Sequence, residues 1–151
     1  TMHAMHDAAQ AWWASGAGNY KPLFLTVLAE VALKANETRT AQQFLDEART
    51  QQDLTNEGWA QAETDRIEAT LQATDHPADL LFERAIRTAR RQQARMFELR
   101  TAIASQRTCE RLNCVPETSP DIRGILGAIS GSPQNCDIAE ALAAVDQAKT
   151  L

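Results

Sequence analysis

The chain has 151 residues, of which 44% are apolar and 23% are charged, and its formal net charge is −5. This length can bury the core of one domain, and the acidic balance argues against a dedicated nucleic-acid-binding protein. No apolar run approaches the roughly 20 residues of a membrane-spanning helix, and the first residues lack the basic and apolar segments of a signal peptide. Three cysteines, an odd number, do not suggest a disulfide framework, so we expect a cytoplasmic protein that does not contact a membrane.

The middle of the chain is composed of residue types that favour helices. Between Ala29 and Val115 the only glycine and proline are Gly58 and Pro77, and Ala, Gln, Glu, Leu and Arg dominate. These residues have high helix propensity, and the β-branched and aromatic runs that are typical of strands are absent. The sequence therefore predicts an all-α protein.

The expected helices follow one another with short breaks. An alanine-rich first helix ends at Gly16, and Pro22 suits the first turn of the second helix. A third helix begins after Thr38 or Thr40 as its N-cap, and Pro77 separates the fourth from the fifth, because the residue before a proline resists helical geometry. The predicted helices span residues 7–14, 22–35, about 40–52, 57–74, 78–93, 95–112 and 138–149.

Two triplets of small, large and small residues recur along the chain, shifted by 37 residues. In both triplets the spacing is i, i+4, i+7, so the three side chains share one helix face. A neighbouring helix can approach closely at the alanines while the large side chain fills the space between them. A period of roughly 20 to 50 residues is typical of stacked helical repeats. The triplets are Ala41, Leu45, Ala48 and Ala78, Phe82, Ala85.

Three segments carry a resemblance to known repeats. Residues 28–48, which read LAEVALKANETRTAQQFLDEA, resemble a tetratricopeptide hairpin, with Ala29 at the small position of its first helix. Residues 55–71 and 89–104, and most specifically residues 90–100, resemble the C-terminal repeat region of large bacterial signalling proteins. In those proteins a class III adenylate/guanylate cyclase or a winged-helix DNA-binding domain precedes an ATPase module and then the repeats.

This resemblance implies a right-handed superhelix of stacked antiparallel hairpins in a single domain over residues 1–151. It implies a non-catalytic protein-interaction or regulatory module, whose partner is a protein, a peptide or another domain of the same parent chain. Since the chain opens at Thr1, we also expect it to be a piece of a larger multidomain protein. The expected units are a partial repeat at 1–18, hairpins at 19–53, 56–93 and 95–131, and a capping helix at 137–150.

In such an array the first helix of each hairpin lines a concave surface. The positions that the repeat alignment places in this groove have mixed charge, which suits a peptide or a neighbouring domain better than a polyanion. The alternative interpretation is that each position is ordinary solvated polar surface. The groove positions are Thr26, Glu30, Lys34, Glu63, Arg66, Thr70, Glu98, Thr101 and Ser105.

Residues that could carry chemistry are few and scattered. The chain has no phosphate-binding loop and no His-Glu-x-x-His zinc motif. His3 and His6 lie one helical turn apart, but with Cys109 and Cys114 they do not form the compact ligand pairs of a zinc site. The Asp-His pair at 75–76 precedes a proline and is interpreted as part of the break between two helices. We therefore expect no metal, no cofactor and no catalytic residue, and the cysteines are interpreted as buried or incidental thiols.

A basic stripe is the strongest alternative to the groove. Eight arginines against two acidic residues lie between positions 84 and 111, and four of the arginines follow one helix face if the helix stays regular. Arginine pairs with carboxylates and phosphates through a rigid fork, so a nucleic-acid-binding helical domain is the rival hypothesis. Aromatic residues for base stacking are not interleaved with the stripe, so a solvated face or a protein surface is favoured over nucleic acid. The stripe is Arg84, Arg87, Arg91 and Arg95.

Adjacent tryptophans mark the start of the chain. Trp12 and Trp13 cannot both face one core, because neighbouring helical residues point in different directions. One of them is expected in an exposed patch that contacts an upstream repeat or a second copy of the chain. A homodimer formed through this end of the stack is therefore a further hypothesis.

Overall fold

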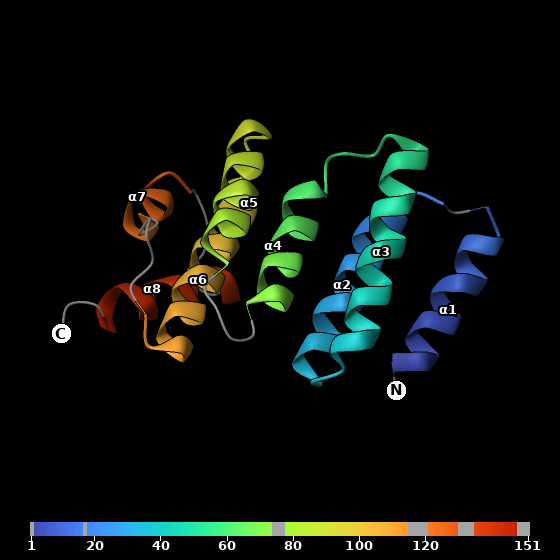
Figure 1. The fold of residues 1–151 in the computed structure, drawn as a ribbon. Coiled ribbons are helices and arrows are strands. Elements are labelled where there is room, and N and C mark those ends of the chain that lie inside the picture. Colours follow the sequence, from blue (N-terminus) through green and yellow to red (C-terminus); the bar gives the residue numbers. More distant parts are fainter. Residues whose placement is uncertain (1, 17, 74–77, 115–120, 130–134, 148–151) are drawn as a thin grey trace.

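Eight helices make up the part of the chain that the computed structural model describes, which is residues 2–16, 18–73, 78–114, 121–129 and 135–147. These residues contain no strand, which confirms the all-α class (Figure 1). The helices are α1 (Met2–Ala14), α2 (Lys21–Lys34), α3 (Thr38–Thr55), α4 (Gln61–Gln72), α5 (Asp79–Arg91), α6 (Arg95–Leu112), α7 (Ile122–Gly127) and α8 (Cys136–Gln147).

Three helix ends share one backbone motif. After α2, α5 and α6 a backbone N–H donates a hydrogen bond to the carbonyl oxygen five residues earlier, with an N···O distance of 2.9 Å. The pairs are Glu37 to Ala32, Ala94 to Ala89 and Cys114 to Cys109. The residue before each donor has a left-handed conformation, with φ of 59°, 55° and 52° at Asn36, Gln93 and Asn113. This motif satisfies carbonyl groups that the helix end leaves open and reverses the chain within a few residues.

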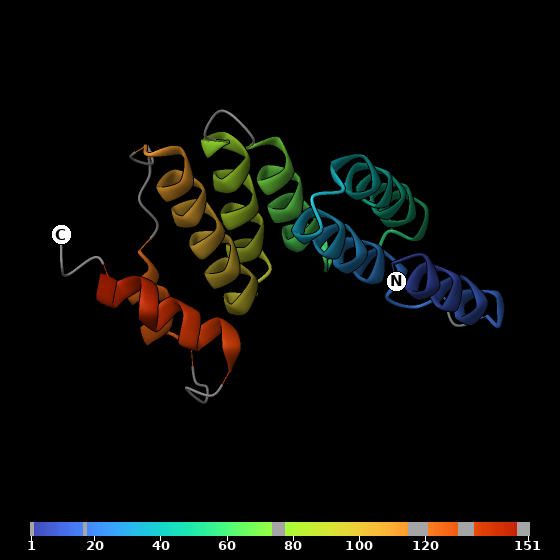
Figure 2. The ribbon, with the colours of Figure 1, turned by 90° about the horizontal axis from the view of Figure 1, so that it is seen from below.

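Successive helices from α1 to α6 run antiparallel, and their backbones pack only against helices at most two positions away among those described (Figure 1). Each of α1 to α5 packs against the next helix, and in addition α2 contacts α4, α4 contacts α6 and α6 contacts α8. The helices therefore form a row with two open ends, and α1 and α8 lie far apart (Figure 2).

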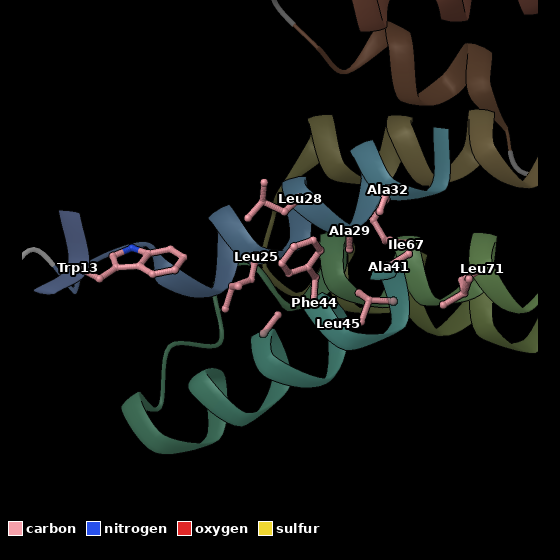
Figure 3. Packing of buried hydrophobic residues seen from close by; sticks show 11 residues of the cluster. Trp13, Leu25, Leu28, Ala29, Ala32, Ala41, Phe44, Leu45, Ile67 and Leu71 are labelled. Carbon is pink, nitrogen blue, oxygen red and sulfur yellow. The ribbon is translucent and has the colours of Figure 1, made fainter. Parts of the chain in front are cut away.

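The alanine triplets are buried where neighbouring helices meet. Ala41, Ala48 and Ala85 have no exposed surface, and Leu45 and Phe82 are buried beside them. Ala78 is only half-buried, because it lies at the N-cap of α5 rather than within the helix. Around the first triplet, side chains of α2, α3 and α4 form one apolar cluster (Figure 3). The predicted role of the alanines as close-packing positions is confirmed for Ala41, Ala48 and Ala85 but not for Ala78.

The two ends of the chain differ from the predicted elements. The helix expected at 7–14 begins at Met2, and its Trp13 is buried while Trp12 is exposed, as the adjacent positions predict. The second helix of the hairpin expected at 95–131 is the short α7. The expected capping helix at 137–150 is α8 through Gln147, and residues 148–151 lie outside the described part. Apolar side chains of α6, α7 and α8 form their own cluster, which includes Leu99, Ile125 and Ile138.

Replacing Ala85 by leucine should destabilise the protein, because three extra carbon atoms must enter a site with no free surface. We expect Ala85→Leu to lower the free energy of unfolding by about 1–3 kcal/mol in urea titrations. The matched control is Ala143→Leu on the exposed face of α8, which should change stability by less than about 0.5 kcal/mol. Equal effects at the two sites would contradict the packing described for α5.

Candidate interaction groove

A groove of about 820 Å³ runs along the row of α2, α4, α6 and α8. Its apolar surface comes from side chains such as Leu33, Leu71 and Ile103. Charged side chains on the same helices surround this surface, and the cations outnumber the carboxylates. The cations are Lys34, Arg66, Arg100, Arg107 and Arg111, and the carboxylates are Glu30, Asp137 and Glu140.

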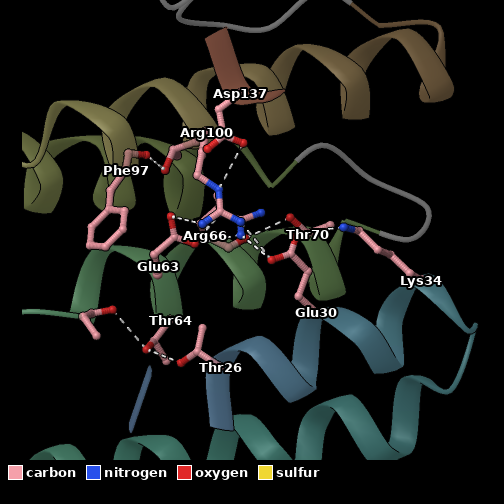
Figure 4. A network of polar contacts seen from close by, with 12 residues as sticks. Thr26, Glu30, Lys34, Glu63, Thr64, Arg66, Thr70, Phe97, Arg100 and Asp137 are labelled. Carbon is pink, nitrogen blue, oxygen red and sulfur yellow. Dashed lines mark hydrogen bonds and ion pairs between the residues drawn. The ribbon is translucent and has the colours of Figure 1, made fainter. Parts of the chain in front are cut away.

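Four charged residues join α2, α4 and α6, and three of them, Glu30, Arg66 and Arg100, also line the groove (Figure 4). Arg66 donates to Glu63 at 2.7 Å on its own helix and to Glu30 of α2 at 2.9 Å. Arg100 of α6 donates to the same Glu30 oxygen at 3.1 Å, and its Nη1 lies 3.2 Å from Oε1 of Glu63. This second contact is an ion pair without hydrogen-bond alignment, since Oε1 of Glu63 is buried and has no hydrogen-bond partner among the described residues. We call these four residues the charge bridge.

In the charge bridge, burial and ion pairing shift the pKa values of Glu30 and Arg66 in opposite directions. Burial by itself raises the pKa of Glu30, but the attraction of Arg66 and Arg100 is stronger in sum, so the pKa lies below its ordinary value. Burial similarly disfavours the charge on Arg66, yet Glu63 and Glu30 hold the pKa of Arg66 above its ordinary value. Glu30 and Arg66 are therefore both charged at neutral pH, and the charge of each depends on its partners.

A second charge cluster lies between α3, α4 and α5, away from the groove. The buried carboxylate of Asp65 accepts hydrogen bonds from Arg49 at 3.0 Å and from Arg84 at 3.2 Å. Both arginines also bind Glu68, one turn further along α4. Arg84 thus ties α5 to α4 instead of standing free on the surface.

The structure divides the nine predicted groove residues into two sets. Glu30, Lys34, Arg66 and Thr70 line the groove. The other five are buried between helices, where Thr26 shares a 2.9 Å hydrogen bond with Thr64 and Thr101 donates to the Phe97 carbonyl oxygen at 2.8 Å. These buried residues are Thr26, Glu63, Glu98, Thr101 and Ser105, and none of them lines the groove.

Sequence reasoning missed groove residues on α6 and α8. Arg100, Arg107 and Arg111 follow the i, i+7, i+11 spacing of one helix face, which would have indicated a shared direction. Asp137 and Glu140 were not expected in the groove, because the last helix was predicted only as a cap. Arg107 forms an ion pair with Glu140 at 2.6 Å, so α8 contributes to the groove as well as closing the row.

The predicted basic stripe is interrupted. Helix α5 ends at Arg91 and Arg95 begins α6, so the four arginines do not lie on one continuous helix. Arg84 pairs with Asp65, Arg87 with Glu83 at 2.9 Å and Arg95 with Glu98 at 2.8 Å, while Arg91 is exposed. Internal carboxylates thus compete with any phosphate for three of the four, and nucleic-acid binding by the stripe stays an untested hypothesis.

Of the residues considered for chemistry, Cys109 and Cys114 are hydrogen-bonded to each other, while His6 lies in α1. No group of three histidine, cysteine or acidic side chains in the described regions could hold a metal ion. Burial and a hydrogen bond with Cys114 raise the pKa of the Cys109 thiol to about 12, so this thiol stays protonated at neutral pH and is a poor nucleophile. Residues 75–77 and the His3 side chain lie outside the described part. None of the described helices is both long and apolar enough to cross a bilayer.

Protein-family models, curated proteins and solved structures were compared with the chain, and none matches it. The functional argument therefore depends on the geometry and the charge of the chain itself. Its most distinctive feature is a groove whose lining has more cations than carboxylates and includes three residues of the charge bridge.

Removing one member of the charge bridge should lower the free energy of unfolding far more than removing a surface arginine. Arg66→Met leaves Glu63 buried without its hydrogen-bonded cation, and we expect a loss of about 3–5 kcal/mol in the free energy of unfolding. The control Arg87→Met breaks an exposed pair with Glu83 and should cost less than about 1 kcal/mol. Urea titration of both variants makes the comparison, and similar losses would contradict the buried bridge.

The stability contributed by Glu30 should depend on pH in a defined direction. Its pKa is lower in the folded chain than the ordinary value of 4.5, so the ionised carboxylate stabilises the fold above that value. This contribution is lost as the pH falls through the lowered pKa. Glu30→Gln should therefore be less stable than the wild-type chain at pH 7, and the difference should shrink as the pH falls well below 4.5. Chemical denaturation at several pH values tests this, and a pH-independent difference would refute it.

Proposed function

We propose that this chain is a non-catalytic protein-interaction module whose groove binds an acidic, partly apolar segment of a protein. The segment belongs either to a separate protein or to another domain of the parent chain. The observation that carries the proposal is the surplus of cations around the apolar surface of the groove.

The packing supports a tetratricopeptide-like right-handed superhelix as the scaffold. Antiparallel helices follow one another in a row, and α2, α4 and α6 contact one another in turn along one side. Buried alanines at corresponding positions allow the hairpins to approach closely, and short turns with left-handed residues close three of the helices. Such arrays present an extended concave surface to their partners.

The charges of the groove support an anionic segment as its occupant. Glu30 is shared by Lys34, Arg66 and Arg100, and Glu63 pairs with the same two arginines, so the five cations that line the groove stand against four carboxylates in and beside it. The side chains of Lys34 and Arg107 are 76% and 64% exposed, which leaves them accessible to a partner carboxylate. Apolar side chains between them can bury leucine-like residues, and the groove has the volume of a cleft for a short segment.

The proposed biological setting is a cytoplasmic bacterial signalling protein. In that setting, occupancy of the groove would report a partner to an upstream cyclase or DNA-binding domain. The mechanism is complementarity of shape and charge, without a chemical step.

The proposal is tested with short fluorescein-labelled peptides that alternate glutamate with leucine. We expect fluorescence anisotropy to show binding of this peptide and at least about tenfold weaker binding of matched peptides with glutamine or lysine in place of glutamate. Lys34→Glu combined with Arg107→Glu should weaken binding by about tenfold or more, because both side chains line the groove.

The matched control carries the same charge changes outside the groove. Arg87→Glu combined with Arg91→Glu alters exposed residues of α5 and should change peptide affinity by less than about twofold. If no peptide binds, or if all three bind equally, the groove proposal is wrong. Binding of a DNA duplex that falls steeply with salt and requires Arg87 and Arg91 would favour the rival stripe instead.

A further inference from the structure

Four aromatic side chains from α1, α2 and the segments just before α2 and α4 remain half-exposed. Trp12 packs edge-on against Phe24 with a centroid distance of 5.3 Å, and Tyr20 packs edge-on against Trp59 at 5.4 Å. The two pairs are one helical turn apart, since the Phe24 N–H donates to the Tyr20 carbonyl oxygen. With Val27 these residues form the aromatic edge, and each is between 40% and 54% exposed.

A helix face with the same spacing is covered one hairpin further along the row. On α4, Thr64, Ile67 and Leu71 have the spacing i, i+3, i+7 and are buried against α2 and α3. On α2 the spacing recurs at positions 24, 27 and 31, where Phe24 packs against Trp12 of α1 and both Phe24 and Val27 stay half-exposed. On α4, then, a face with this spacing is covered by the antiparallel pair α2 and α3, whereas on α2 it stays partly exposed.

The lack of charge on the aromatic edge indicates what kind of partner can cover it. The aromatic edge itself contains no charged residue, and neighbouring Lys21 is neutralised by Glu47 at 3.3 Å and lies over the Trp13 ring. Two copies of a chain with net charge −5 repel each other over much of their surface, but they can meet at an uncharged edge without like-charge contact. A neutral apolar surface also offers nothing that would select a charged partner.

The size of the edge fits a weak contact between two chains. Five half-exposed side chains present on the order of 400–500 Å² of apolar surface, within the range of functional patches on single chains. A standard interface buries about 800 Å² on each partner, so the edge can form the apolar centre of such an interface. Tryptophan and tyrosine are the residues that most often dominate binding energy there.

We propose that the aromatic edge is the contact surface of a homodimer with two-fold symmetry. In this dimer the antiparallel α1–α2 pair of each copy covers the aromatic edge of the other, as the α2–α3 pair covers the corresponding face of α4 within one chain. An isologous contact of this kind is self-complementary and closes at two copies. The groove lies along α2, α4, α6 and α8 and does not include any residue of the edge, so this inference is independent of the proposed function.

Sedimentation velocity over a range of concentrations tests the homodimer. The full chain should convert from monomer to dimer with a dissociation constant on the order of 10–100 μM. Phe24→Asp places carboxylates from both copies in the contact and should weaken association at least about tenfold. Tyr20→Lys changes the most exposed residue of the edge and should have the same effect. It replaces Phe24→Asp as the test variant if circular dichroism shows that Phe24→Asp disturbs the fold.

Two matched variants separate this surface from others. Leu80→Asp changes an exposed leucine of α5 and should leave dimerisation unchanged, as should the groove variant Lys34→Glu with Arg107→Glu. A chain that stays monomeric up to millimolar concentration would overturn the proposal and leave the edge to a different helical partner. A dimer that is insensitive to Phe24→Asp and Tyr20→Lys would overturn it as well.

Discussion

The shared carboxylate of Glu30 is the constraint on which the arrangement of the central helices depends. It accepts hydrogen bonds from Arg66 of α4 and from Arg100 of α6, which are 36 and 70 residues away in the chain. Charges removed from water are tolerated only when partners replace that water at close range. The three helices must therefore hold one register, and that register also places Lys34 and Arg107 beside the groove.

Apolar spacing predicted most of the helices and their packing. The triplets around Leu45 and Phe82 gave the buried faces correctly, because small residues repeated at helical spacing mark the positions where two helices approach closely. The helix over 95–112 was predicted with its observed bounds, while the ends of the others moved by a few residues. Helix ends depend on single residues such as Gln93, whose left-handed conformation has no strong signal in the sequence.

Polar residues at helical spacing were harder to interpret, since a solvated face and a buried ionic contact look alike along one helix. Glu63 and Glu98 were predicted to face a partner, but arginines of the same chain cover them. Arg84 was predicted on an outer stripe, whereas Asp65 of the preceding helix holds it. Such pairing depends on which helix lies opposite, and this information is absent from the periodicity of a single element.

The partial accessibility of Arg100 has a mechanical consequence. Its guanidinium lines the groove while it binds Glu30 and Glu63, so an incoming anion would compete with these internal counter-ions. Any exchange of partners would loosen the tie between α2 and α6 and alter their separation. Under the proposed function, an anion in the groove would therefore change how α2 and α6 are held together, and Glu30 and Glu63 would take Arg100 back when the anion leaves.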